Sequence, residues 1–261
     1  MNLSLTNKTA LVCGASQGIG LATAQELAKL GATCILLARN EESLQTAVDT
    51  LPANYNQKHR YLVADFSNTE NVKIIAENIT ANYPIHILIN NTGGPAGGPI
   101  LDAKEEDFIN TFNQHLICNH ILTKAVVPSM KSGGYGRIIN IISTSVKIPL
   151  KNLGVSNTIR GAVASWAKTM ANELGQFNIT VNNVLPGATK TSRLESIIKN
   201  AATKQQKEIE NIEEEMQQEI PMKRFGEPQE IANVAAFLAT PAAAYVNGVS
   251  IAVDGGRTGS L

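Results

Sequence analysis

The stretch TALVCGASQGIGLATAQELAKLG, residues 9–31, decides the fold class of this protein. Residues 9–13 form a continuous apolar run, which is typical of a buried strand, and residues 21–31 have the pattern of a helix that ends at Gly31 as its C-cap. A glycine-rich turn, GASQGIG (14–20), separates the two elements. A strand, a glycine turn and a helix in this order predict the first unit of a parallel α/β sheet.

The same alternation continues along the chain. Further apolar runs predict strands at 32–38, 61–65, 85–90, 136–142, 179–186 and 249–253. The segments between them predict helices at 41–51, after 67, at 104–130, 152–175 and 227–239. Ser67 and Glu70 have the spacing of a capping box for the second of these, and Pro228 lies near the first turn of the last.

Strands that are buried on both faces have continuous apolar runs rather than alternating ones. The sequence therefore predicts a single doubly wound (Rossmann) domain over residues 1–261, with a parallel seven-stranded sheet and helices on both faces. The charged, glutamine-rich segment at 195–219 departs from the pattern, and we expect either a solvated surface helix or a mobile lid over a substrate cleft. These two interpretations are compatible, and we delimit a substrate-lid insertion at 190–222.

Composition excludes several classes of function. The 22 basic and 22 acidic side chains cancel, which argues against a nucleic-acid-binding protein, and no apolar run is long enough to predict a membrane span. The opening residues MNLSLTNKTA lack the features of a secretory signal, so we expect a cytoplasmic protein. Cys13, Cys34 and Cys118 are odd in number and scattered, which predicts neither a metal site nor a disulfide framework.

The glycine turn is a candidate phosphate-binding site. Gly14, Gly18 and Gly20 allow the backbone to turn tightly and to approach a pyrophosphate, and the helix that follows presents free N–H groups at its N-terminus. The context of strand, turn and helix is the one that this mechanism requires, and the alternative is a tight turn without a ligand. The spacing is Gly-x-x-x-Gly-x-Gly rather than Gly-x-Gly-x-x-Gly.

The chain resembles the short-chain dehydrogenase/reductases in this turn and in several further segments, and it is most similar to their 3-oxoacyl-acyl-carrier-protein reductase type. The matching segments are GASQGIG (14–20), Asp65, NNTG (90–93), RIINIIS (137–143), ITVNNVLPG (179–187), PMKRFGEPQEIA (221–232) and VDGG (253–256). The resemblance implies a nicotinamide dinucleotide cofactor and a small-molecule substrate. It also implies that Asp65 contacts the adenine, that Asn91 supports the fourth strand and the adenosine side, and that Pro186, Gly187 and Thr189 hold the nicotinamide carboxamide.

The residue after the second strand favours NADP(H) over NAD(H). A carboxylate usually accepts a hydrogen bond from the ribose 2′-hydroxyl of NAD at this place, whereas this chain has Ala38 followed by Arg39, whose cation could pair with a 2′-phosphate. The alternative is that Arg39 is only a solvated arginine. The complete candidate cofactor-binding set is Gly14, Ser16, Gln17, Gly18, Ile19, Gly20, Arg39, Asp65, Phe66, Asn91, Gly93, Arg160, Pro186, Gly187 and Thr189.

The catalytic motif departs from the pattern of the family. The resemblance implies a serine, a Tyr-x-x-x-Lys pair and a helix asparagine, and Ser143 stands at the serine position. Ser156 stands at the tyrosine position, Arg160 at the lysine position and His115 at the asparagine position. No Tyr-x-x-x-Lys occurs anywhere in the chain.

This departure has a chemical consequence. A tyrosine phenol titrates near pH 10 and a neighbouring cation lowers its pKa, whereas an aliphatic hydroxyl is a far weaker acid. We therefore expect cofactor binding to survive better than proton transfer. The candidate catalytic residues are Ser143, Ser156, Arg160 and His115, the last acting through a water relay or else serving as a hydrogen-bonded core histidine.

Two functions remain open from the sequence. The first is an NADP(H)-dependent oxidoreductase of a carbonyl/alcohol pair, similar to a 3-oxoacyl thioester reductase. The second is a dinucleotide-binding pseudoenzyme, acting as a sensor or as a subunit of an oligomer. The resemblance also implies a homotetramer, or a homodimer, packed through the small residues Gly161, Ala162, Ala164 and Ser165, although these residues could instead pack within the subunit.

Overall fold

The computed structural model describes residues 1–260 and contains one seven-stranded sheet. All the strands are parallel, and their order across the sheet is β3-β2-β1-β4-β5-β6-β7. Their bounds are β1 (Thr9–Cys13), β2 (Thr33–Ala38), β3 (Arg60–Val63), β4 (Ile87–Asn90), β5 (Gly136–Ile141), β6 (Ile179–Pro186) and β7 (Ser250–Val253). The order reverses between β1 and β4, which is where ligands bind in open parallel sheets.

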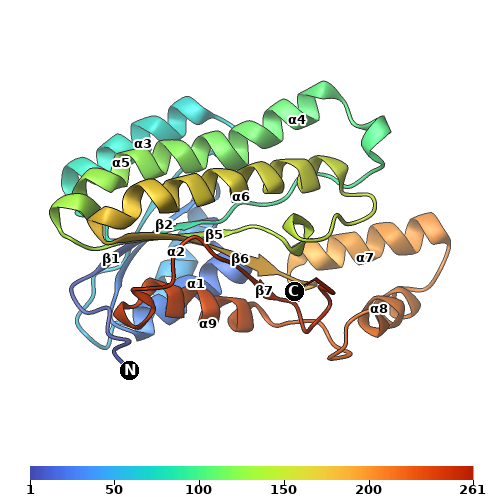
Figure 1. Ribbon diagram of the computed structural model, residues 1–261. Helices are drawn as coiled ribbons and strands as arrows, with labels where there is room; N and C mark the ends of the chain where they lie inside the picture. The colour runs from blue at the N-terminus through green and yellow to red at the C-terminus, as the bar shows by residue number, and fades with distance from the viewer. Residues whose placement is uncertain (261) are drawn as a thin grey trace.

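Helices cover both faces of the sheet (Figure 1). One apolar core packs α1 (Gly18–Lys29), α2 (Glu41–Asp49) and α9 (Pro228–Ala239) against one face. The other core packs α3 (Thr69–Asn82), α5 (Cys118–Ser132) and α6 (Gly154–Leu174) against the opposite face. The predicted fold class is confirmed.

The predicted helix at 104–130 is not uniform. The chain forms α4 (Glu105–Phe112), then a π-helical turn at Asn113–Ile117, and then α5. The wider turn places His115 in the interior, where it is 1% exposed, while α4 and α5 keep their own buried faces. The 3.6-residue periodicity of the sequence does not reveal such a turn, because a π-turn adds a single residue to the helix.

Two local predictions about helix ends need correction. Asn68, not Ser67, caps α3, with its side chain accepting a hydrogen bond from the Asn71 amide at 3.0 Å. The Ser67 amide instead donates to the Asp65 carboxylate at 3.0 Å, so Ser67 belongs to the turn that precedes the helix. Gly31, with φ of +102°, follows the C-cap residue Leu30 rather than forming the cap itself.

The charged segment folds into a helical hairpin, α7 (Ser192–Gln205) and α8 (Ile209–Gln218), which extends beyond the sheet (Figure 1). The hairpin has an apolar core of its own, formed by Leu194, Ile198, Ala202, Ile212, Ile220 and Phe225. Its two ends are joined at the base, since the Lys190 amide donates to the Gly226 carbonyl and the Gly226 amide to the Ala188 carbonyl, both at 2.9 Å. Both interpretations of this segment, a solvated surface helix and a lid over a substrate cleft, are compatible with a helical unit that extends beyond the sheet.

Within residues 1–260, no helix combines the length and the apolar character that crossing a membrane requires.

Candidate functional site: a dinucleotide cleft at the carboxyl ends of the strands

The turn between β1 and α1 has the backbone geometry that its glycines predict. Gly14 and Gly18 both have φ of +58°, in the left-handed region that favours glycine. A Cβ atom on Gly20 would lie 2.1 Å from the Gly14 carbonyl oxygen, so no larger residue fits there. The glycines therefore allow this turn to pack tightly.

The N-terminus of α1 is left without an internal acceptor. Its N-cap residue Gln17 has extended backbone geometry and makes no side-chain capping bond, and the first turn contains no acidic residue. The first N–H groups of a helix need acceptors and lie at the positive end of the helix dipole. These residues therefore fit the pyrophosphate of a dinucleotide, as the glycine pattern predicts.

Asn91 holds the turn in place from the neighbouring strand. Its Nδ2 atom donates to the carbonyls of Cys13 at 3.3 Å and Gly14 at 3.2 Å. These bonds connect the end of β4 to the end of β1, which is the supporting position expected for Asn91. The neighbouring Gly93 has open space around the position of its absent Cβ.

The start of α7 covers the other side of the turn, a feature that the sequence analysis missed. The Thr191 methyl carbon would lie 3.4 Å from a Cβ on Gly18, and Gln17 Nε2 donates to Ser192 Oγ at 3.4 Å. Thr191 is also the N-cap of α7, accepting from the Leu194 amide. A threonine directly before a helical pattern is a signal for a cap, and it would have located this helix start.

The adenosine side combines one free cation with one carboxylate. Arg39 is exposed directly after β2, and it forms no ion pair within the described residues 1–260. The hydrogen bond from Ser67 holds the pKa of Asp65 below its usual value, and the charge of Arg39 acts in the same direction. The ring of Phe66 is buried in the apolar core, which leaves only its backbone available to a nucleotide.

The predicted carboxamide side follows β6. The Gly187 amide donates to the Val253 carbonyl at 3.0 Å, and a Cβ on Gly187 would lie 2.7 Å from Asp254, so this turn packs closely against the end of β7. Thr189 is buried and donates to the Gly187 carbonyl at 3.0 Å. The structure thus brings Gly187 and Thr189 together at the carboxyl end of the sheet.

Ser143 follows the end of β5, and the guanidinium group of Arg160 reaches the ends of β4 and β5 from helix α6. Ser143 follows β5 and caps a short helical turn, with its Oγ atom accepting from the Ser145 amide at 3.1 Å. Arg160 on α6 is 7% exposed, and its Nη1 atom donates to the Ile141 carbonyl at 3.1 Å. Its Nη2 atom donates to the Thr92 carbonyl at 3.4 Å, so the guanidinium bridges the ends of β4 and β5. Ser156 is partly buried on the same helix, one turn before Arg160.

His115 is a buried, neutral histidine. Its Nδ1 atom pairs with the Thr92 hydroxyl, and its Nε2 atom has no hydrogen-bond partner in the described part of the chain, residues 1–260. Burial, together with the positive charge of Arg160, lowers the pKa of His115 to about 2. At neutral pH this ring is therefore the neutral imidazole, whose remaining N–H is far too weak an acid to protonate a substrate.

No tyrosine replaces the missing phenol within the part of the chain that the structure describes. Four of the five tyrosines precede strands and so lie towards the amino edge of the sheet: Tyr55, Tyr83, Tyr135 and Tyr245. The fifth, Tyr61, lies in the edge strand β3 and donates to Glu41. His59 and His86 accept backbone hydrogen bonds from Cys34 and Thr9, which are structural roles.

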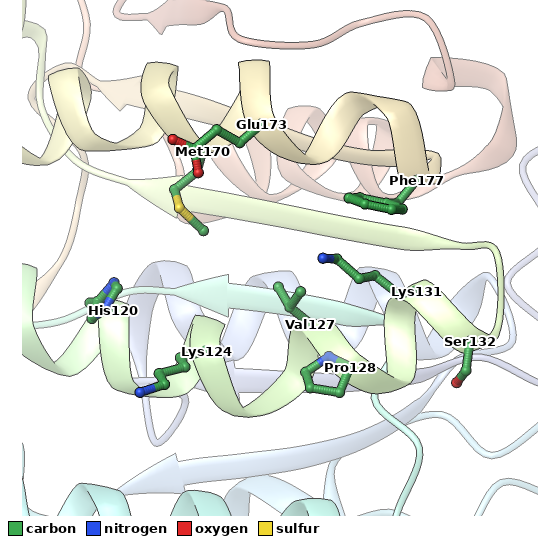
Figure 2. A pocket seen from close by; sticks show the side chains of 9 residues that line it. All are labelled: His120, Lys124, Val127, Pro128, Lys131, Ser132, Met170, Glu173 and Phe177. Carbon is green, nitrogen blue, oxygen red and sulfur yellow. The ribbon is translucent and has the colours of Figure 1, made fainter.

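A separate hollow of about 810 Å³ lies between α5 and α6 (Figure 2). His120, Lys124 and Lys131 line it from α5, and Met170 and Glu173 line it from α6. The ammonium of Lys131 lies 3.9 Å from the centre of the Phe177 ring at one end. These residues lie on the outer face of the two helices, away from the phosphate turn.

No cluster of three or more metal-ligating side chains occurs between residues 1 and 260. The site therefore consists of a phosphate turn, a free cation beside the adenosine side and a polar group of residues at the ends of β4 and β5.

Comparison with known proteins agrees with this geometry. The family model described as enoyl-(acyl carrier protein) reductase matches residues 14–258. The NADPH-dependent reductase BacG of Bacillus subtilis is 32% identical over 259 residues, covering 98% of this chain and 100% of the relative. The 3-oxoacyl-[acyl-carrier-protein] reductase FabG of Pseudomonas aeruginosa is 35% identical over 258 residues, covering 97% and 98% of the two chains.

The crystal structure of L-sorbose reductase from Gluconobacter frateurii, complexed with NADPH and L-sorbose, matches with a TM-score of 0.93 and 29% identity over the whole of both chains. The fold, the phosphate turn and these matches lead to one conclusion: this chain belongs to the short-chain dehydrogenase/reductase family.

Proposed function

We propose that this protein is an NADP(H)-dependent oxidoreductase that acts on a carbonyl/alcohol pair of a small molecule, similar to a 3-oxoacyl thioester reductase. The observation that carries the proposal is the phosphate turn, with its two left-handed glycines and the uncapped N-terminus of α1. The reductases BacG and FabG, which are similar over nearly their whole length, support an oxidoreductase.

The cofactor is NADP(H) rather than NAD(H). Arg39 is a free cation within residues 1–260 at the end of β2, where a 2′-phosphate would lie, and the position directly after that strand holds this arginine rather than a carboxylate. BacG is named as NADPH-dependent, and the sorbose reductase structure contains NADPH. The phosphate turn, Arg39 and Asp65 would hold the adenosine half, while Gly187 and Thr189 would hold the nicotinamide.

When bound, the cofactor supplies or accepts the hydride. In the direction of reduction, negative charge develops on the substrate oxygen, and Ser143 donates a hydrogen bond to that oxygen. Arg160 stabilises the charge electrostatically, since burial lowers its pKa only to about 10 and the guanidinium stays cationic at neutral pH. Ser156 lies one turn away on the same helix and provides a further hydroxyl.

We assign the proton to water rather than to a side-chain acid. His115 is neutral and neither serine is a stronger acid than water, so the proton comes from solvent water, and the hydroxide that remains is neutralised by exchange with the bulk. In this proposal His115 positions Thr92, and through it the loop after β4, rather than delivering a proton.

A dinucleotide-binding pseudoenzyme is the second candidate. Arg160 uses its Nη atoms on the Ile141 and Thr92 carbonyls, and it lacks the phenol partner that a lysine serves in the family. On this alternative the chain binds NADP(H) as a sensor or as a subunit of an oligomer, with little turnover.

Stopped-flow measurement of NADPH oxidation separates the two candidates. The substrates are a panel of ketones and 3-oxoacyl thioesters, and the variant is Ser143→Ala. Turnover by the wild type that falls by about 10²-fold in the variant, with NADPH affinity unchanged, supports the oxidoreductase. Tight NADPH binding without consumption on any substrate favours the pseudoenzyme, and failure to bind NADPH contradicts both.

The same proposal covers the lid, the assembly and the location. The hairpin from 190 to 222 closes over the substrate, because its joined base and its own core let it move as a unit.

The chain forms a homotetramer or homodimer through the outer face of α6, where Gly161, Ala162 and Ala164 are partly exposed. The three cysteines are buried free thiols, which suits the reducing cytoplasm.

A further inference from the structure

Two arginines converge on the loop that follows β4. Arg160 donates to the Thr92 carbonyl at 3.4 Å, and Arg193, from the first turn of α7, donates to the Pro95 carbonyl. A Cβ on Gly94, between these two carbonyls, would lie 3.6 Å from Arg193 Nη2. The two guanidinium groups therefore share one short stretch of backbone at the carboxyl end of β4.

Neither cation has an acidic partner among the described residues 1–260. The ion pairs formed within residues 1–260 involve other side chains, and the nearby Lys190 is already paired with Glu227 at 2.6 Å. Both guanidinium groups donate to the loop at 92–95, and burial, followed by the positive charge of Arg193, lowers the pKa of Arg160. Two cations placed together with no carboxylate cost stability, and an anion between or beside them would recover it.

We propose that the substrate of this enzyme carries a negatively charged group, a carboxylate or a phosphate, which binds to Arg193 in the positive field of Arg160. The inference rests on the proposed oxidoreductase function and names the class of its substrate. The planar guanidinium of Arg193 presents two parallel N–H donors, which match the oxygens of either group. Because Arg193 belongs to α7, an anion held there would also draw the helical hairpin onto the cleft.

The pyrophosphate of the cofactor could in principle use the same charge, but the contacts separate the two positions. Thr191 and Ser192, not Arg193, border the phosphate turn. The side chain of Arg193 reaches instead to the loop at 93–99. That loop continues to the residues before α6, where the Gly98 amide donates to the Asn152 carbonyl at 2.7 Å.

Matched pairs of carbonyl compounds test the proposal. The pairs are 2-oxobutanoate, 3-oxobutanoate and 4-oxopentanoate with their methyl esters, and dihydroxyacetone phosphate with dihydroxyacetone. We measure kcat/KM for NADPH oxidation by the wild type, Arg193→Gln and Arg193→Lys. The same compounds are titrated calorimetrically into the NADP⁺ complex, which gives a binding readout that does not require turnover.

We expect at least one charged compound to be preferred over its neutral partner by about tenfold or more, and Arg193→Gln to remove most of that preference. Arg193→Lys keeps part of it, and the NADPH affinity of both variants stays within about twofold of the wild type. Arg60→Gln is the matched control, because it removes one exposed arginine on β3, away from the loop, and leaves the preference unchanged.

Other outcomes separate this inference from the proposed function. Charged compounds that bind in an Arg193-dependent way without being reduced would uphold the anion site and contradict the oxidoreductase. Neutral partners that bind and react as well as the charged compounds would overturn the anion site. A loss of NADPH affinity in Arg193→Gln, with the preference intact, would assign Arg193 to the cofactor pyrophosphate and would equally overturn it.

Discussion

At the residue scale, His115 shows how burial decides what a titratable side chain can do. Its ring lies in a π-helical turn, 1% exposed, and one nitrogen pairs with the Thr92 hydroxyl. Burial, with Arg160 second, lowers the pKa of the folded-state imidazole to about 2, whereas an unfolded histidine titrates near 6.5. Between these values the unfolded chain binds one more proton than the folded chain, so stability rises with pH.

Replacing this histidine removes its part of the pH dependence. The contribution of His115 to the free energy of unfolding is complete above about pH 7 and decreases as the pH falls. By pH 5 about 2 kcal/mol of it has been lost. We expect His115→Asn to lose about 2 kcal/mol less stability than the wild type between pH 7 and pH 5. Urea unfolding of both proteins at the two pH values measures the difference.

His59 and His86 also have lowered pKa values because of burial, and they contribute equally to both proteins, so they serve as an internal control. The same loss of stability in both proteins would show that His115 takes up a proton in the folded state.

The sequence assigns Ser143 and Arg160 to their motif positions, but it does not give the directions in which their side chains point. Ser143 and Arg160 were located because recognisable motifs fix the register on both sides of them. That Arg160 points to the carbonyls of Thr92 and Ile141 depends on two strand ends that are distant in the chain. The same is true of Arg193, whose contact with Pro95 joins residues 98 positions apart.

At the scale of elements, a line of polar side chains crosses four neighbouring strands, from β4 to the edge strand β7. The register aligns Asn90, Asn140, Asn183 and Ser250 on β4, β5, β6 and β7. Asn90 Nδ2 donates to Asn140 Oδ1 at 2.9 Å, Asn140 Nδ2 to Asn183 Oδ1 at 2.9 Å, and Asn183 Nδ2 to Ser250 Oγ at 3.1 Å. Asn140, the middle one of the three asparagines, therefore satisfies the buried Nδ2 donor of Asn90 and the buried Oδ1 acceptor of Asn183.

Removal of that middle residue is expected to destabilise the sheet. Asn140→Ala leaves Asn90 Nδ2 and Asn183 Oδ1 buried without partners, and each such group costs about 1–3 kcal/mol, for a total of about 2–6 kcal/mol. Chemical denaturation measures the change in the free energy of unfolding.

The control is Asn78→Ala on the exposed side of α3, for which we expect a change within about 0.5 kcal/mol. Equal stabilities of the two variants would mean that the line of asparagines does not hold the strands together.

The elements themselves followed from local patterns, whereas their junctions did not. Each apolar run became a strand, and β1, β2, β4, β5 and β6 are buried along nearly their whole length, whereas β3 and β7 at the edges are only partly buried. The cap of α3 at Asn68 instead of Ser67, and the π-turn inside the long helix, depend on which amides the adjoining turn leaves free. The asparagine line requires the register between strands, which local sequence does not specify.

At the scale of the whole molecule, the outer face of α6 is the surface on which the proposed assembly depends. Gly161 is partly buried, and a Cβ placed on it would meet no atom within 4 Å, so a large side chain fits the isolated subunit. The hollow of about 810 Å³ between α5 and α6 is also lined by residues of this helix (Figure 2).

Gly161→Trp should therefore leave the subunit folded and separate the copies. Light scattering is expected to give two or four times the chain mass for the wild type and a lower mass for the variant. Gln45→Trp, at an exposed position of α2 on the other side of the sheet, is the control and should not change the mass. A monomeric wild type, or an unchanged mass for Gly161→Trp, would reject packing through this face.

The central claim is that the chain keeps a complete site for a phosphorylated nicotinamide dinucleotide although the phenol of the family is absent. Equilibrium titration of the wild type and Arg39→Gln with NADPH and with NADH tests it most directly. We predict saturable binding of NADPH by the wild type, at least about tenfold tighter than that of NADH, because a guanidinium–phosphate contact is worth about 1.5–3 kcal/mol. Arg39→Gln should bring the two affinities together. Equal affinities in the wild type, or no saturable binding of either nucleotide, would contradict the account.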